Sequence, residues 1–137
     1  MALSHVLDAS VLMRLRRPEV RDAIESRMRG GELARAGICD LELGFSARTA
    51  AEWDEIAEDL AAFELVETTA EHVRRARQVQ RLLAAHHQRG RKVPDLLVAA
   101  AAEADGLTVM HYDADFDRIA AVTGQSCEWV VPAGEID

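Results

Sequence analysis

Residues 94–111 read Pro-Asp-Leu-Leu-Val-Ala-Ala-Ala-Ala-Glu-Ala-Asp-Gly-Leu-Thr-Val-Met-His, and this segment carries the clearest signal of the fold class. From 95 to 104 it is apolar on almost every side, which is typical of a buried helix, and Pro94 suits the first turn. Residues 107–111 have the length and composition of a short buried strand, and a further helix is predicted over 116–122. Buried helices on either side of a buried strand are typical of α/β proteins with a parallel sheet.

The same alternation of strands and helices continues over the rest of the chain. Further strands are predicted at 5–8, 33–38, 64–67 and 128–131, and further helices at 19–29, at 40–48, from 50 onward after Thr49 as N-cap, and at 70–88 with Gly90 closing the last. Right-handed crossovers then predict a three-layer α/β/α fold around a central, mainly parallel five-stranded sheet. No linker, repeat or low-complexity tract interrupts residues 1–137, so we expect a single domain.

The charge balance limits the classes of function. The chain of 137 residues has 16 Lys and Arg against 24 Asp and Glu, a formal net charge of −8. A protein held on nucleic acid by its overall charge would be basic, whereas an enzyme that meets RNA or DNA through a metal site and a local basic patch is compatible with this balance. Such a patch exists, because every charged residue between Glu71 and Lys92 is Arg.

We expect a cytoplasmic protein that makes no use of a membrane. The first residues lack the positive start and apolar run of a signal peptide, and the longest apolar run, 96–102, is too short to span a bilayer. The 2 cysteines, Cys39 and Cys127, lie far apart and form no CxxC pair. This argues against a disulfide framework or a structural zinc site and fits a reducing compartment.

Acidic residues recur where the predicted strands end. Asp8 ends the first strand, Glu42 lies in the helix after the second, Asp113 follows the strand at 107–111, and Asp95 opens the buried helix. Taken singly, each is equally well explained as a helix cap or a solvated loop residue. Sites in parallel sheets form outside the carboxyl ends of the strands, so we expect these acids to converge. Converging carboxylates repel unless a cation neutralises them, and hard oxygen ligands suit Mg²⁺, with Mn²⁺ as a substitute.

Four blocks of sequence carry a resemblance to a known family. They are Val6-Leu-Asp-Ala-Ser10, Asp40-Leu-Glu-Leu-Gly44, Val93-Pro-Asp-Leu-Leu-Val-Ala-Ala100 and His111-Tyr-Asp-Ala-Asp-Phe-Asp117. In this order they resemble PIN-domain ribonucleases, and most closely the VapC toxins of VapBC toxin–antitoxin systems. The resemblance covers nearly the whole chain. It implies endonucleolytic cleavage of RNA with Mg²⁺ or Mn²⁺, a cognate VapB-like antitoxin over the helices between Val11 and Phe63, and a homodimer.

The resemblance also implies roles for single residues. Asp8, Glu42, Asp95 and Asp113 fall on the four catalytic acids, and Asp8, Asp95, Asp113 and Asp115 would hold the metal, with Ser10 supporting Asp8. Two departures concern residues where relatives often carry a small hydroxyl side chain: Cys39, three residues before Glu42, and His111. Because Cys39 is a poor N-cap, we expect Asp40 to cap the helix that carries Glu42.

The basic helix has two interpretations. Arg74, Arg77 and Arg81 are spaced to share one face and would contact RNA phosphates, or they are simply the solvated face opposite a buried stripe. The arginines at 14, 16 and 17 present the same choice.

Three other classes of function compete with the ribonuclease. An aspartyl-nucleophile phosphatase would need a second Asp where Ser10 stands, and a phospho-receiver would need a lysine after a late strand. The remaining alternative is a catalytically silent PIN scaffold that binds RNA or a partner. Acids at all four positions argue against it, since a silent scaffold does not need their mutual repulsion.

Overall fold

A parallel sheet forms the centre of the molecule. The computed structural model describes residues 2–88 and 92–137, which form a five-stranded sheet in the order β3-β2-β1-β4-β5 with every neighbouring pair parallel. The strands are β1 (His5–Leu7), β2 (Leu33–Ala36), β3 (Glu64–Val66), β4 (Thr108–His111) and β5 (Cys127–Trp129). The predicted fold class is therefore confirmed.

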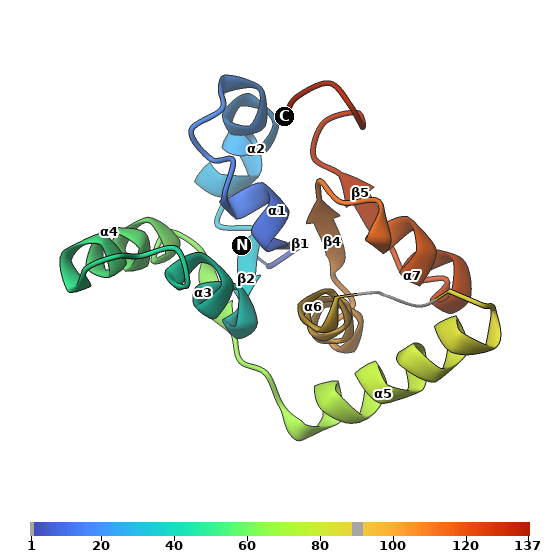
Figure 1. Cartoon of the computed structure of the whole chain (residues 1–137). Coiled ribbons are helices and arrows are strands. Elements are labelled where there is room, and N and C mark those ends of the chain that lie inside the picture. Colours follow the sequence, from blue (N-terminus) through green and yellow to red (C-terminus); the bar gives the residue numbers. More distant parts are fainter. Residues whose placement is uncertain (1, 89–91) are drawn as a thin grey trace.

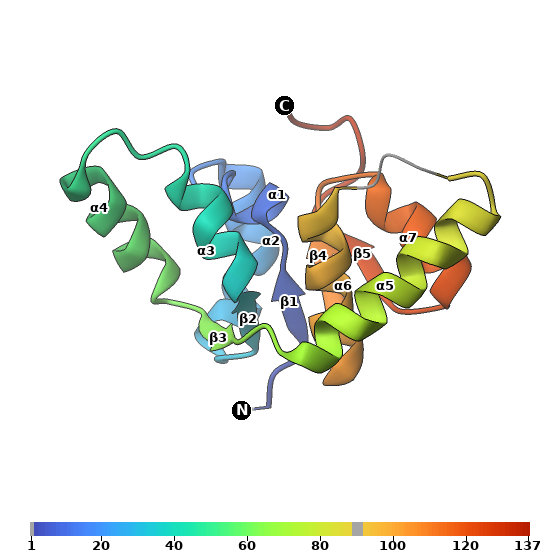
Figure 2. The ribbon, with the colours of Figure 1, turned by 60° about the horizontal axis from the view of Figure 1, so that its bottom comes forward.

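Helices connect the strands and cover the sheet (Figure 1). They are α1 (Ala9–Leu12), α2 (Pro18–Arg29), α3 (Gly37–Gly44), α4 (Ala50–Leu60), α5 (Ala70–Ala85), α6 (Val93–Ala104) and α7 (Asp115–Thr123). Figure 2 shows α5 and α6 in front of the sheet and α2 behind it, while α4 projects to one side. In contrast, α3 packs against α1, α6 and β2. None of the helices described is both long and apolar enough to cross a membrane.

The order of the strands explains where a site can form. From β1 the chain steps outward through β2 to β3, and it then returns to the other side of β1 to add β4 and β5. The connections leave β1 and β4 in opposite directions, so the boundary between these two strands is the topological switch point of the sheet. Leu7 pairs with Met110 across this boundary, and the residues that follow both strands emerge side by side.

The buried helix α6 forms the centre of the core. It contacts β1, β2 and β4, and α5 and α7 pack against it in turn. Its central residues Val98, Ala99 and Ala102 are at most 1% exposed, as the all-round apolar sequence predicts. Small alanine side chains allow this helix to lie close to the strands, and its first turn is thereby held at the carboxyl end of the sheet.

The structure corrects several details of the sequence prediction. A short helix, α1, follows β1 directly and was not predicted, and β2 ends at Ala36 because α3 begins earlier than expected, at Gly37. The expected N-cap at Asp40 is wrong: the N-cap residue of α3 is Ala36, without a side-chain hydrogen bond. Asp40 instead accepts hydrogen bonds from Arg35 at 2.7 and 3.2 Å. The expected helix stop at Gly90 lies outside the described residues.

Candidate active site

Asp8 is fixed at the point where β1 passes into α1. Its backbone N–H donates to the carbonyl of Met110 at 2.9 Å, which ties it to the end of β4. Its side chain caps α1, because Oδ2 accepts from the backbone N–H of Ser10 at 3.0 Å and from the Ser10 hydroxyl at 2.6 Å. The other oxygen, Oδ1, is buried and accepts no hydrogen bond from a described residue. Burial raises the pKa of Asp8 against the opposing effect of Ser10.

Ser10 links the two strand ends at the switch point. While its hydroxyl donates to Asp8, the same oxygen accepts the backbone N–H of Tyr112 at 2.8 Å, just beyond β4. This places Ser10 where the resemblance implied a supporting residue. One hydroxyl therefore fixes both the orientation of the Asp8 carboxylate and the path of the chain toward Asp113.

Replacing Ser10 by Ala tests this link. We expect the pKa of Asp8 to rise further, because the carboxylate loses its shortest donor. Loss of a supporting hydrogen bond of this kind costs about 10- to 100-fold in metal affinity or activity, and the unpaired Tyr112 N–H costs about 1 kcal/mol of stability. Mg²⁺ titration and chemical unfolding measure both effects. Ser10→Thr keeps the hydroxyl and is the matched control; unchanged metal affinity in Ser10→Ala contradicts the supporting role.

Asp113 follows β4 and has several polar partners. Its backbone N–H donates to Nδ1 of His111 at 3.2 Å, its Oδ1 accepts from the backbone N–H of Asp115 at 2.9 Å, and its Oδ2 lies 2.8 Å from Nζ of Lys92. Burial acts to raise the pKa of Asp113, but the Lys92 ammonium and the Asp115 N–H outweigh it, so the pKa is lowered. Asp113 therefore stays ionised.

Asp95 enters the site from the first turn of α6. The residue is 2% exposed, and its Oδ2 is buried without a hydrogen-bond partner among the described residues. Burial, followed by the charges of Asp8 and Asp113, raises the pKa of Asp95 to about 8. A pKa raised this far by burial and by neighbouring acids marks Asp95 as a candidate functional residue.

Glu42 approaches from α3, close to Asp8. Its Oε1 is buried and lacks a described hydrogen-bond partner, and burial followed by the charge of Asp8 raises its pKa. The Cys39 thiol lies one turn earlier on the same helix and is completely buried. Burial and the charges of Asp8 and Glu42 raise the pKa of this thiol, so it is protonated.

The acids form two adjoining groups around the switch point. Ligand atoms of Asp8, Cys39 and Glu42 lie within 4.8 Å of one another, and so do those of Asp95, Asp113 and Asp115. Asp8 acts electrostatically on both Glu42 and Asp95, which joins the two groups into one acid cluster. One buried carboxylate oxygen on each of Asp8, Glu42 and Asp95 has no described hydrogen-bond donor, so each of these acids favours either a bound proton or a cation nearby. The donor set is oxygen-rich, which fits Mg²⁺ or Mn²⁺.

The structure brings all five predicted acids together and adds residues that sequence reasoning did not place there. Lys92 contacts Asp113, a contact that the sequence did not predict. Its position three residues before Asp95, at a helix start, was the available signal. His111 is fully buried, stacks on Phe116 with ring centroids 4.9 Å apart, and accepts the Asp113 N–H. Here it replaces the hydroxyl side chain that the resemblance led us to expect.

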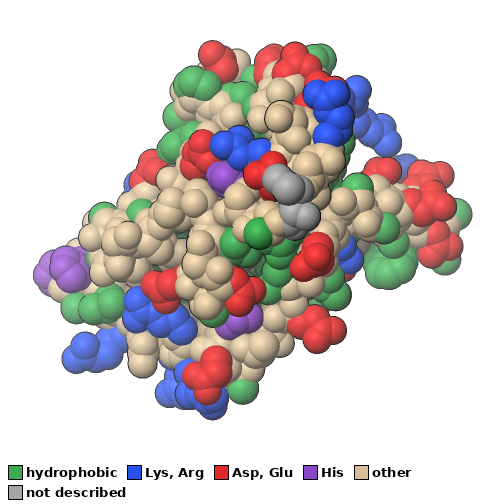
Figure 3. All heavy atoms as spheres, turned by 180° about the vertical axis from the view of Figure 1, so that it is seen from behind, with side chains coloured by type: hydrophobic (Ala, Val, Ile, Leu, Met, Phe, Trp, Pro, Cys, Tyr) green, Lys and Arg blue, Asp and Glu red, His purple; other side chains and the backbone are tan. Residues whose placement is uncertain are grey.

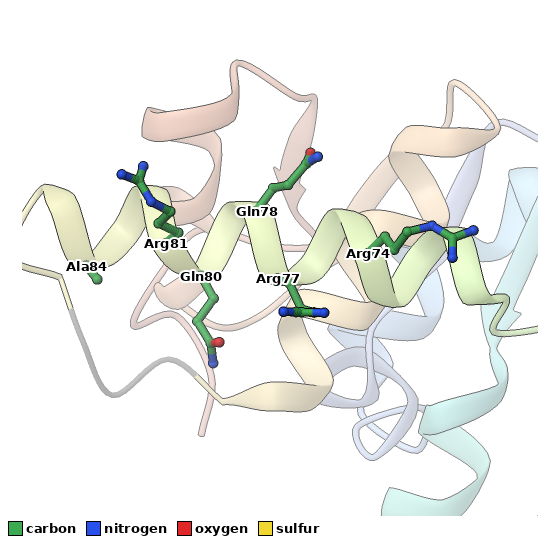
Figure 4. A pocket seen from close by; sticks show the side chains of 6 residues that line it. All are labelled: Arg74, Arg77, Gln78, Gln80, Arg81 and Ala84. Atoms are coloured by element: carbon green, nitrogen blue, oxygen red, sulfur yellow. The ribbon is translucent and has the colours of Figure 1, made fainter.

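Three arginines of α5, Arg74, Arg77 and Arg81, line a shallow hollow of about 700 Å³ on the surface. Figure 4 shows their guanidinium groups spread along the helix, with Gln78 and Gln80 between them. Arg74 forms an ion pair with Glu71, whereas Arg77 and Arg81 form none with a described residue. Two predicted phosphate contacts are therefore exposed and carry charge that no described acid neutralises.

Comparison with known proteins points to one family. Residues 5–122 match the family model for the PIN domain. The chain is 61% identical over 137 residues to Ribonuclease VapC51 of Mycobacterium tuberculosis, with 100% of both chains covered. It is 40% identical to Ribonuclease VapC18 of the same organism, covering 95% of this chain and 97% of that protein. The crystal structure of VapBC2 from Rickettsia felis, bound to a DNA fragment from their promoter, matches the fold with a TM-score of 0.78 at 16% identity, over 94% of this chain and 98% of that chain.

Proposed function

Because this chain belongs to the PIN-domain family and is similar over its full length to VapC ribonucleases, we propose that it is a metal-dependent endoribonuclease, the toxin of a toxin–antitoxin pair. The observation that carries the proposal is the acid cluster at the switch point, with its buried, unpartnered carboxylate oxygens. A scaffold that only bound a partner would gain nothing from burying these charges, which cost stability when no cation is bound.

The proposed chemistry is hydrolysis of an RNA phosphodiester. Asp8, Asp95, Asp113 and Asp115 would hold Mg²⁺ or Mn²⁺, which when bound makes a water molecule more acidic and offsets charge on the phosphate. Ser10 keeps the Asp8 carboxylate in place, and the first turn of α6 does the same for Asp95. Oε1 of Glu42 is suited to accept the proton of the attacking water, because the pKa of this carboxyl is raised. The water oxygen bonds to phosphorus as an ester P–O bond breaks, and the leaving ribose oxygen keeps the electron pair of that bond and takes a proton from solvent.

The direct test is cleavage of a generic RNA by the purified chain. We expect Mg²⁺ or Mn²⁺ to support cleavage and EDTA to abolish it, with DNA of the same sequence as the control substrate. A folded protein that leaves RNA intact with either metal would support the silent scaffold instead.

The arginines of α5 are proposed to contact the RNA backbone. Replacing both Arg77 and Arg81 by Gln removes the two cations of α5 that form no ion pair with a described residue. We expect a higher KM with little change in kcat, and a salt dependence of RNA binding whose log–log slope falls by about 0.7 for each lost contact. Arg48→Gln, which removes a cation paired with Glu52 at 2.9 Å, is the matched control. If the log–log salt slope of RNA binding equals that of the wild type, Arg77 and Arg81 do not contact RNA phosphates.

The proposed partner is a VapB-like antitoxin that covers the helices between Val11 and Phe63. A hollow of about 370 Å³ between α1, α3 and α4 is lined by apolar residues such as Leu12, Leu43 and Ile56. Phe45 nearby is 92% exposed. Acidic side chains gather on the projecting helix in Figure 3, and α4 carries five acids and no basic residue. This charge disfavours RNA and suits a basic, partly apolar segment.

Because the resemblance to VapC toxins implies it, we further propose that the chain forms a homodimer. Light scattering of the isolated protein tests this, and the mass of a monomer alone would refute it. Addition of the antitoxin should bury Phe45 and inhibit RNA cleavage.

A further inference from the structure

Lys92 brings a positive charge into the acid cluster from the start of α6. It is the chain's single lysine and the N-cap residue of α6, three residues before Asp95. Its Nζ lies 2.8 Å from Oδ2 of Asp113; the side chain of Asp113 is 18% exposed, whereas that of Lys92 is 61% exposed. One partner of this ion pair is therefore fixed in the cluster, and the other reaches in on a flexible stem.

The ammonium acts on more than the carboxylate it touches. Its charge opposes the rise in the pKa of both Asp95 and Glu42, so it interacts with both groups of acids. In the described part of the chain, the other basic side chain that contacts the cluster is Arg118, whose Nη1 lies 3.4 Å from Oδ1 of Asp115 at the rim. Lys92 is thus placed to neutralise the cluster while it holds no metal.

We propose that Lys92 is a built-in counter-cation of the acid cluster, which a divalent cation must displace from Asp113 and which then contacts an RNA phosphate. This rests on the function proposed above. Two cations repel strongly when they share one carboxylate at hydrogen-bond distance. When the divalent cation binds, Lys92 is the cation that leaves Asp113. A solvent-exposed ion pair is weak, and the aliphatic stem of the lysine is free to move.

Displacement leaves Lys92 beside the substrate. Its backbone stays at the start of α6, next to Asp95, while Nζ swings out toward solvent. The anion that the reaction brings to this edge of the sheet is the phosphodiester, and a lysine ammonium suits a phosphate oxygen as a point charge. The same charge that lowers metal affinity therefore favours RNA binding.

Metal titration of two variants tests the counter-cation. Lys92→Met keeps most of the stem without the charge, and Lys92→Arg keeps the charge. Arg48→Met, which breaks the exposed ion pair with Glu52, controls for loss of one positive charge elsewhere. Mg²⁺ is titrated calorimetrically into the EDTA-treated, dialysed proteins at pH 8, where protons compete less for the same oxygens. We expect Lys92→Met to bind Mg²⁺ about three- to tenfold more tightly than the wild type, with Arg48→Met and Lys92→Arg within about twofold of it.

The outcomes separate this proposal from the ribonuclease assignment. If Lys92→Met binds Mg²⁺ as tightly as the wild type or more weakly, the proposal that Lys92 is a counter-cation is wrong, regardless of whether the protein cleaves RNA. Tighter binding in a protein that cleaves no RNA keeps the counter-cation and refutes the ribonuclease. With Mg²⁺ saturating, Lys92→Met should raise the KM for RNA about three- to tenfold with a smaller change in kcat. An unchanged KM overturns the phosphate contact.

Discussion

Asp8→Asn and Asp95→Asn are each expected to reduce metal-dependent RNA cleavage by about 10³-fold while leaving the fold intact. The amide keeps the shape of the carboxylate, and both side chains are 2% exposed in a packed site, so little else changes. What is lost is a charged metal ligand whose free oxygen has no described hydrogen-bond donor. Steady-state cleavage with saturating Mg²⁺, together with circular dichroism of each variant, measures the effect.

The other acids extend the same prediction. Glu42→Gln and Asp113→Asn should show losses of similar size, and Asp115→Asn an intermediate one, since Asp115 lies farther along the chain from β4. Asp117→Asn is the matched control. Asp117 lies in the first turn of α7, where it accepts from Trp129 Nε1 at 3.1 Å, so its neutralisation should cost at most about 0.3–1 kcal/mol of stability and leave cleavage nearly unchanged. Full activity in a folded Asp8→Asn protein refutes the site, and an inactive Asp117→Asn protein means that a metal ligand is misassigned.

The fold and the convergence of the acids were predictable because they depend on patterns spread over many residues. Alternating apolar strands and helices predict a parallel sheet, and a parallel sheet sends the residues after β1 and β4 to one edge. Asp8 and Asp113 could therefore be placed together without knowing any side-chain contact. The resemblance then distinguished these acids from ordinary helix caps.

Details that depend on one contact were not predictable. Asp40 has the chemistry of an N-cap, yet it pairs with Arg35, whose guanidinium also donates to the carbonyl of Leu60 at 2.9 Å. The ion pair with Arg35, which a long-range hydrogen bond holds in place, therefore determines the position of Asp40 more than its preference for an N-cap does. The contact of Lys92 was not predictable either: its position three residues before Asp95 places it near that acid, but only the folded structure shows that its side chain reaches Asp113.

The metal-free protein is expected to lose stability as the pH rises from neutral to 8. Burial and neighbouring charges raise the pKa of Asp95 from 3.8 to about 8, so the folded state keeps a proton that the unfolded state has already released. This proton adds to the free energy of unfolding. Its contribution is fully present below the pKa of Asp95 in the unfolded state and is lost as the pH rises through the pKa of Asp95 in the folded state. The raised pKa values of Asp8 and Glu42 act in the same direction.

His111 and Asp113 have lowered pKa values, so their contributions to the free energy of unfolding depend on pH in the opposite sense. Burial lowers the pKa of His111, so its contribution grows with pH but is complete near its unfolded pKa of about 6.5. The lowered pKa of Asp113 matters only below about pH 4. Between pH 7 and pH 8 the acids with raised pKa values therefore dominate among these groups, and the pKa of Asp95, about 8, lies at the upper end of this interval.

Urea unfolding in EDTA at pH 7 and pH 8 makes this measurable. The wild type should lose about 1 kcal/mol of unfolding free energy over this interval through Asp95, whereas Asp95→Asn should change less and be about 1–3 kcal/mol more stable at pH 8. Millimolar Mg²⁺ should reverse the order, because binding to the folded state stabilises the wild type and the Asn variant has lost a ligand. If Asp95→Asn is no more stable than the wild type in EDTA at pH 8, the carboxyl is not strained by its neighbours. If Mg²⁺ then stabilises both proteins equally, Asp95 is not a ligand.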